Sequence, residues 1–442
     1  MRFPKTNKKR LIFYSLVCCV VVAFICFVLG RIPGQQYRTT FQTFAHPPGA
    51  TPTNTVLEIS EDFTLGFVEF DDQGWLWSRK QVDTLTNRLY AEQRTNGLLI
   101  VVFVHGWMHN ASPEDGNVMT FRKKMLRPLA KMESFVSEKQ HRAKRRVVGV
   151  YVGWRGLSES LPFLKFSTFW ERKNAAERVG HGAVVELICE LEKLRNHGNW
   201  QHRPQIENHQ TMSTKLLIIG HSFGGDVVYS ALAPILIQRM IEHVDTGSDA
   251  TAPDTVGDLV VLINPAFEAA RFETLQRLGI TRQFPPTRNC TLAVFTSKSD
   301  MATKIAFPAA RMPLSSIFQG YRDSAQRAAN QTALGHYDPY INFDLVIPHK
   351  ERAEEADDDT KSGERVLLLG DQIKNAQNKT NEDGAYRFTH CQLQPRTNHV
   401  NSDPVFVVSV DPNIIPDHGS IDRGVFTRFL AEFLSVFSET EN

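Results

Sequence analysis

Beyond about residue 55, the chain alternates between short apolar runs and longer segments in which apolar residues recur at helical spacing. The run Leu98–Val104 is apolar at every position. A strand without polar alternation is covered on both faces, as in the centre of a mostly parallel sheet. Similar runs predict the remaining strands, at 55–59, 63–70, 146–152, 215–219, 258–263, 291–295 and 405–410.

Helical patterns lie between these runs. They predict helices over about 78–94, 116–138, 171–195 and 424–437, and another directly after the strand at 215–219. Alternation of strands and helices favours one α/β domain with a doubly wound, mostly parallel sheet. We expect this domain to cover residues 55–442.

Two segments interrupt the alternation. Residues 157–170 are too apolar for an ordinary exposed loop, and we interpret them either as a lid over a site or as a helix packed on the core. Residues of about 305–400 form an insertion with some extra strands. Its acidic run Glu351–Asp359 is typical of a solvated loop.

The N-terminal segment Leu11–Leu29 is apolar or aromatic apart from Ser15, and about 20 such residues cross a bilayer. The basic residues before it predict a cytoplasmic tail and transmembrane anchor over 1–30, with membrane contact through 11–30 and the domain on the extracytoplasmic side. A cleaved signal peptide is the alternative, but its apolar core is usually shorter. The Pro- and Gly-containing residues 31–54 are interpreted as a stalk.

Charge and histidine spacing exclude some classes of function. The formal charge is +2, which gives no electrostatic reason to expect a nucleic-acid partner. The basic run 141–146 is interpreted as a solvated connection. Histidines before residue 225 lack the spacing of a zinc site, so we expect neither a metal nor a cofactor.

A candidate nucleophile lies in Gly220-His221-Ser222-Phe223-Gly224, which follows an apolar strand and precedes a helical pattern. This is the arrangement of a nucleophile elbow, in which a sharp turn exposes the serine hydroxyl and small neighbours avoid clashes. The pattern of glycines alone is weak. The strand before Ser222 and the helix after it make the prediction more specific.

A serine nucleophile needs a base, and the base needs a carboxylate that holds its tautomer. The expected order along the chain is serine, acid, histidine. His418, in the loop after the last predicted strand, is the expected base. Asp300 is the expected acid, with Glu268 and then Asp411 as alternatives, and a helix N-cap is the simpler role for Asp300.

Acyl transfer also requires hydrogen-bond donors for an oxyanion. The backbone N–H of Phe223 follows the nucleophile directly. The second donor is expected from the loop His105-Gly106-Trp107, through the N–H of Trp107. We expect His105 to order this loop and not to act as the base.

Together, Phe103–Trp107, Gly220–Gly224, Ser297–Asp300 and Asp417–Gly419 resemble the serine esterase and lipase branch of the α/β-hydrolase superfamily. Within it, the chain is most similar to poorly characterised bacterial α/β hydrolases in which a strand ends in aromatic-x-x-Trp, here Tyr151–Trp154. The resemblance implies Ser222 as nucleophile, Asp300 as acid and His418 as base.

The expected function is therefore a membrane-anchored serine hydrolase that cleaves a small-molecule or lipid ester, or a thioester, through an acyl-enzyme. One alternative is a catalytically inactive, hydrolase-like binding module tethered to the membrane. Acyl transfer to an acceptor other than water is another.

Overall fold

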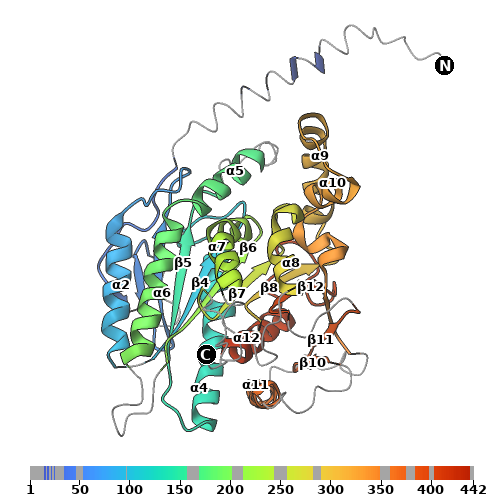
Figure 1. Ribbon diagram of the computed structural model, residues 1–442. Helices are drawn as coiled ribbons and strands as arrows, with labels where there is room; N and C mark the ends of the chain where they lie inside the picture. Colours follow the sequence, from blue (N-terminus) through green and yellow to red (C-terminus); the bar gives the residue numbers. More distant parts are fainter. Residues whose placement is uncertain are drawn as a thin grey trace, which may run out of the picture.

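The protein is an α/β domain built on one mixed, mostly parallel sheet of twelve strands, seen in the computed structural model in Figure 1. The strand order is β1-β2-β3-β5-β4-β6-β7-β8-β12-β9-β11-β10. The structure describes residues 34–45, 53–95, 97–156, 169–201, 213–242, 256–281, 290–348, 359–374, 384–397 and 403–438, with six single positions between 14 and 24.

The central strands are all parallel, because each returns through a helical crossover. The antiparallel pairs β2–β3, β9–β11 and β10–β11 lie toward the two ends of the sheet. The strands are β1 (Phe44–Ala45), β2 (Leu57–Ile59), β3 (Phe63–Glu69), β4 (Leu98–Val104), β5 (Arg146–Gly153), β6 (Lys215–His221), β7 (Leu259–Ile263), β8 (Leu292–Ser297), β9 (Phe343–Val346), β10 (Tyr386–Arg387), β11 (Gln392–Pro395) and β12 (Val405–Val410).

Helices cover both faces of the sheet (Figure 1). One face carries α2 (Arg79–Gln93), α5 (Phe169–Gly180), α6 (Val184–Gln201), α7 (Phe223–Glu242) and α8 (Glu273–Thr281). The other carries α3 (Gly116–Thr120), the π-helix η1 (Phe121–Leu126), α4 (Arg127–Lys139), α11 (Asp359–Lys374) and α12 (Gly424–Ser438). The insertion also contributes the π-helix η6 (Ala302–Ala306), α9 (Phe307–Phe318) and α10 (Ser324–Gln331), and short 3-10 turns are η5 (Ala269–Phe272), η7 (Leu334–His336) and η8 (Asp338–Tyr340).

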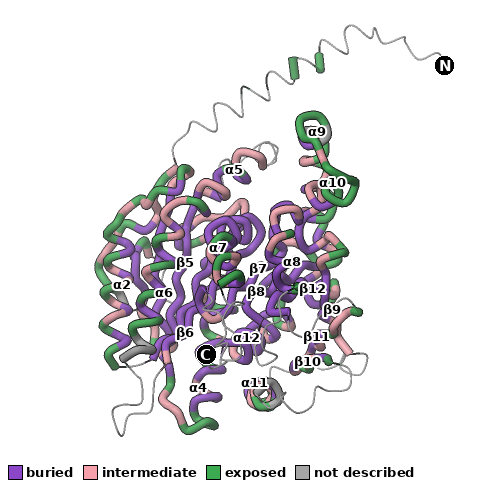
Figure 2. Tube along the Cα trace, viewed as in Figure 1, coloured by how far each residue is buried: buried purple, intermediate pink, exposed green. Residues whose placement is uncertain are grey.

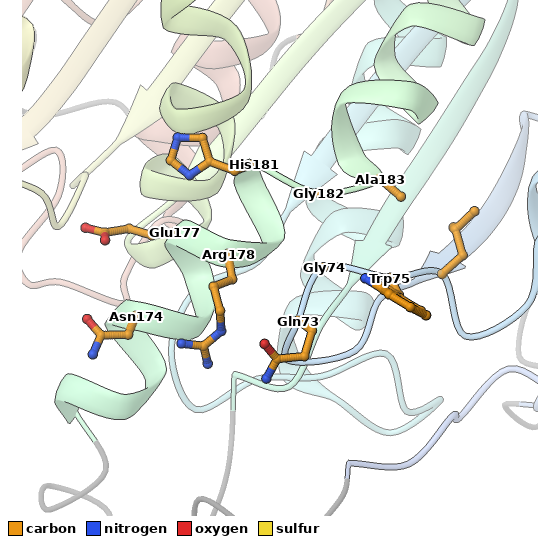
Figure 3. A pocket seen from close by; sticks show the side chains of 10 residues that line it. Gln73, Gly74, Trp75, Asn174, Glu177, Arg178, His181, Gly182 and Ala183 are labelled. Atoms are coloured by element: carbon orange, nitrogen blue, oxygen red, sulfur yellow. The ribbon is translucent and has the colours of Figure 1, made fainter.

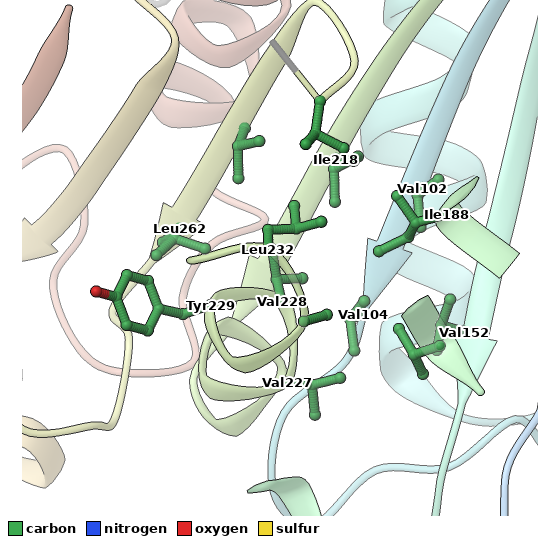
Figure 4. Close-up of a cluster of buried hydrophobic side chains, with 14 of the residues drawn as sticks. Val102, Val104, Val152, Ile188, Ile218, Val227, Val228, Tyr229, Leu232 and Leu262 are labelled. Atoms are coloured by element: carbon green, nitrogen blue, oxygen red, sulfur yellow. The ribbon is translucent and has the colours of Figure 1, made fainter. Parts of the chain in front are cut away.

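The core consists of two apolar layers, one on each side of the sheet. Alternate residues of β4 belong to different layers: Ile100 and Val102 face one, and Val101 and Phe103 face the other. Figure 4 shows the layer in which β-strand valines meet α7, and Figure 2 shows the buried strands at the centre. Every residue of β4 is buried, as its continuous apolar run predicts.

The α/β class and the mostly parallel sheet are confirmed, but the single helix expected over 171–195 is wrong. The chain breaks at Gly180–Gly182 and continues as α6 (Figure 3). A Cβ on Gly182 would lie 2.4 Å from the carbonyl oxygen of Gly74, and one on Gly180 would lie 2.6 Å from that of Val227. The close approach of two other segments therefore interrupts the helix, which local spacing does not reveal.

The expected stalk also differs from the structure at residues 34–45. Arg38 is fully buried, forms an ion pair with Glu58 at 3.1 Å and stacks on the ring of Phe67. Burial lowers the pKa of Arg38 to about 10, while the nearby Glu58 acts in the opposite direction. β1 extends the sheet beside β2, so this part of the chain belongs to the domain.

Several other expectations fall largely outside the described residues. The residues outside the described part are most of 1–30, residues 157–168 of the candidate lid, and most of the acidic run. Phe169 and Trp170, the last residues of the lid segment, begin α5. Within the residues that the structure describes, no helix is long and apolar enough to span a membrane.

Candidate active site

Ser222 lies in a sharp turn between β6 and α7, with a backbone φ of 57°. Its N–H donates to the carbonyl of Ile263 at 2.9 Å, which fixes the turn to the neighbouring strand. A Cβ on Gly224 would lie 2.0 Å from the carbonyl oxygen of Val104, and one on Gly220 would lie 2.5 Å from that of Gly224. The two flanking positions therefore have no room for a side chain, as the elbow prediction requires.

His418 lies between Ser222 and Asp300, although the three residues come from distant parts of the chain. Its Nε2 is 2.7 Å from Ser222 Oγ, and its Nδ1 is 2.7 Å from Asp300 Oδ2. A proton on Nδ1 donates to the carboxylate, which leaves Nε2 to accept the serine hydroxyl. The structure thus brings the three expected side chains into one hydrogen-bonded chain at the carboxyl ends of β6, β8 and β12.

Asp300 combines the two roles considered for it. Oδ1 accepts the N–H groups of Ala302 and Thr303 at 2.9 and 3.2 Å, as an N-cap does. Oδ2 faces His418. Burial acts to raise the pKa of Asp300, but hydrogen bonds from His418 and Thr303 outweigh it and hold the pKa below its usual 3.8. The carboxyl group is therefore ionised at neutral pH.

The alternative acids do not contact His418. Glu268 is buried and pairs with Lys173 at 3.2 Å and with Arg311 at 2.7 Å. Asp411 accepts the N–H of Asn413 at 2.8 Å within its own loop. Of the three carboxylates considered, only Asp300 is hydrogen-bonded to the candidate base.

A second histidine, His336, is linked to Asp300 by hydrogen bonds through Thr303. Thr303 Oγ1 lies 2.5 Å from Asp300 Oδ2 and 2.9 Å from His336 Nε2. Because the threonine hydroxyl donates to the carboxylate, His336 donates to the threonine. Burial lowers the pKa of His336 to about 4, so its ring is neutral. His336 lies in the insertion, and nothing in the local sequence associates it with the site.

Two further residues missed by sequence reasoning position the histidine loop. His221 Nε2 and Asn264 Nδ2 both donate to the carbonyl of His418, at 2.9 and 3.0 Å. Asn264 has a φ of 45° at the end of β7, a conformation in which asparagine is enriched. Ser297 and Ser299 also donate to the loop, at the carbonyls of Ile415 and Pro416.

The loop after β4 packs directly on the serine. A Cβ on Gly106 would lie 2.7 Å from the Cβ of Ser222, so only glycine fits there. His105 is buried, with Nδ1 on the carbonyl of Gly106 and Nε2 accepting the N–H of Trp154. Burial lowers the pKa of His105 to about 4. Both ring nitrogens are therefore engaged in ordering the loop.

Phe223 and Trp107, the residues expected to donate to an oxyanion, directly follow Ser222 and Gly106, which pack against each other. Phe223 is the first residue of α7, where backbone N–H groups have no carbonyl partner within the helix and the helix dipole is positive. Trp107 follows Gly106. The rings of Trp107, Phe223 and Phe169 form a cluster, with centroid distances of 5.5 Å for Trp107–Phe169 and 5.1 Å for Phe169–Phe223. These three aromatic rings thus form an apolar wall beside Ser222.

An open pocket of about 900 Å³ lies elsewhere, between the loop after β3 and the corner of α5 and α6 (Figure 3). It contains none of the five expected site residues. Its lining carries no nucleophile paired with a base. The lining residues are Gln73, Gly74, Trp75, Leu76, Asn174, Glu177, Arg178, His181, Gly182 and Ala183.

Among the described residues, no group of three or more histidines, cysteines or acidic side chains is arranged to hold a metal ion. Comparisons with models of known families, with curated proteins and with solved structures return no match to the chain.

Proposed function

We propose that the protein is a serine hydrolase with an α/β-hydrolase fold, which cleaves a carboxylic ester or thioester through an acyl-enzyme. The observation that carries the proposal is the hydrogen-bonded chain from Ser222 through His418 to Asp300. Its order along the sequence and its place after parallel strands are those of α/β hydrolases. We further propose that residues 11–30 anchor the enzyme in a membrane.

Each residue has a defined part in the proposed reaction. Ser222 Oγ attacks the carbonyl carbon of the substrate while His418 Nε2 accepts the hydroxyl proton. Asp300 stabilises the imidazolium that forms. His418 then returns the proton to the departing alcohol or thiol, which leaves an acyl group on Ser222. Water, deprotonated by His418, releases the acid and restores the serine.

The oxyanion would be stabilised by the N–H groups of Phe223 and Trp107, at the positive end of the α7 dipole. The aromatic cluster of Trp107, Phe169 and Phe223 supports an apolar acyl group as the part of the substrate nearest the serine. Neither feature requires a cofactor.

A fluorophosphonate probe tests the proposal, because it labels only an activated serine. We expect it to label the wild type, and labelling to be lost in Ser222→Ala and strongly reduced in His418→Ala. Ser137→Ala is the control, since Ser137 is a buried serine on α4 that donates only within its own helix. Equal labelling of Ser222→Ala and the wild type would remove the proposal, and absence of labelling in a folded wild type would favour the inactive binding module.

A further inference from the structure

The segment after Asp300 exposes large apolar side chains. Five of them remain more than half exposed: Met301 at 58%, Ile305 at 52%, Met312 at 51%, Ile317 at 72% and Phe318 at 77%. They are called here the apolar surface of α9, and Met301 and Ile305 belong to the turn of helix that leads into α9. Figure 2 shows α9 and α10 as the part of the insertion most open to solvent. Isolated exposed apolar residues need no explanation, but several along two adjoining elements, here η6 and α9, are typical of an interaction surface.

This surface begins at the proposed active site and is held in place by polar contacts. Met301 directly follows Asp300, and η6 and α9 leave from the carboxyl end of β8. Arg311, on α9, pairs with the buried Glu268 at 2.7 Å and donates to Asn330 of α10 at 3.2 Å. Figure 1 shows α9 and α10 extending beyond the sheet on the same side as α5. The hairpin formed by α9 and α10 therefore presents its apolar residues at the edge of the sheet from which substrate would reach Ser222.

The continuous described part of the chain begins at the same edge, with Gly34. Gly34 lies against Trp77 and Arg155, which follow the carboxyl ends of β3 and β5. Leu29, the last residue of the predicted transmembrane segment, is five residues earlier in the sequence, and five residues of chain span at most about 17 Å. Trp75 nearby is 74% exposed, and tryptophan is enriched at membrane interfaces. An anchor over residues 11–30 would therefore bring this edge close to the bilayer.

The charge of the hairpin agrees with an anionic lipid surface. Residues 298–330 contain five basic side chains and two acidic ones, a net charge of +3. One of the two acids is Asp300, which is buried in the proposed active site. Lys298, Arg311 and Arg322 already pair with Asp344, Glu268 and Asp323, so Lys304 and Arg327 are the basic side chains of this segment that can face anionic headgroups.

We propose that the apolar surface of α9 inserts into the lipid bilayer, with Ile317 and Phe318 among the acyl chains. The proposed hydrolase would then act on acyl esters that reside in the membrane and reach Ser222 from the bilayer. The choice of substrate rests on the proposed function, whereas the membrane contact does not.

The contact is tested with the full chain reconstituted into vesicles of equal parts phosphatidylcholine and phosphatidylglycerol. Phe318→Cys is labelled with bimane, and nitroxide groups on the lipid acyl chains serve as quencher. Leu368→Cys on α11 is the matched control, because Leu368 is also exposed, at 55%, but lies on the opposite side of the molecule from α9 (Figure 1). Wild type labelled in parallel gives the background from native cysteines.

We expect nitroxide lipids to lower the emission at position 318 about twofold, because an inserted apolar face lies several ångströms into the acyl region. Emission at position 368 should not change. The proposal would be overturned if nitroxide lipids changed the emission equally at both positions. It would also be overturned if self-association of the protein in detergent shielded position 318, because that result would identify a second copy as the partner.

A kinetic comparison addresses the substrate. Ile317→Ser combined with Phe318→Ser should slow hydrolysis of a long-chain p-nitrophenyl ester dissolved in the vesicles about tenfold, and leave a short, water-soluble ester unaffected. Quenching requires no catalysis, so a wild type that hydrolyses neither ester refutes the proposed function while the quenching result still decides the membrane contact.

Discussion

Replacement of Asp300 by asparagine tests the proposed mechanism at the residue with the most constrained surroundings. Each carboxylate oxygen accepts two hydrogen bonds: Oδ1 from the N–H groups of Ala302 and Thr303, and Oδ2 from Thr303 Oγ1 and His418 Nδ1. An amide has only one acceptor oxygen. In either orientation of Asp300→Asn, the NH2 group therefore faces donors.

These contacts favour one orientation of the asparagine amide. Two buried backbone N–H groups without acceptors would cost about 1–3 kcal/mol each, so the amide oxygen keeps the cap and the NH2 group faces His418. The imidazole must then carry its proton on Nε2, where it can no longer accept the proton of Ser222. We expect kcat to fall about 10⁴-fold, equivalent to about 5 kcal/mol of transition-state stabilisation.

The assay is hydrolysis of p-nitrophenyl butyrate across pH, together with a thermal melt that checks folding. Because the cap is retained, the melting temperature of Asp300→Asn should stay close to that of the wild type. Asp411→Asn is the control, since the Asp411 side chain accepts hydrogen bonds from Asn413 of its own loop, and it should keep wild-type kcat. A folded Asp300→Asn enzyme within tenfold of wild-type kcat would refute the assigned role.

Three further predictions follow from the packing and the protonation states. Thr303→Val removes the hydroxyl that donates to Asp300 and should lower kcat about tenfold, whereas Thr303→Ser keeps the hydroxyl and should retain most activity. Gly106→Ala places a Cβ 2.7 Å from that of Ser222 and should lower kcat about 100-fold, while Gly116→Ala, with no atom within 4 Å, should have no effect. Burial lowers the pKa values of His105 and His221 to about 4 and about 3, so below pH 6.5 the unfolded chain binds protons that the native protein does not. Between pH 7 and pH 5 the free energy of unfolding should therefore fall by about 2 kcal/mol per histidine, and urea titrations that give equal stability at both pH values would contradict this.

Much of the fold is predictable from the sequence because a strand buried on both faces must be apolar along its whole length. β4, β5 and β12 lie within one or two residues of the apolar runs that predict them, and α12 ends one residue later than expected. The exceptions depend on contacts between distant segments. The helix break at Gly180–Gly182 and the burial of Arg38 are set by partners that no local pattern contains.

The same division applies to the candidate site. Ser222 and Gly224 are recognisable because an elbow constrains its immediate neighbours in the chain. The choice of Asp300 over Glu268 is different, since both follow apolar strands. Glu268 is surrounded by Lys173 and Arg311, and only the three-dimensional structure shows that these cations, and not His418, neutralise it.

Hydrophobic periodicity and steric limits within a few residues are enough to predict the α/β class and the position of Ser222 in a tight turn, whereas the order of its expected partners follows from the resemblance to α/β hydrolases. The tertiary structure alone decided which carboxylate meets His418, placed His221, Asn264, Thr303 and His336 around the site, and put the apolar surface of α9 beside it. Hydrogen bonds and burial depend on distances in space. Residues 196 positions apart, such as Ser222 and His418, become neighbours only when the sheet brings the ends of its strands together.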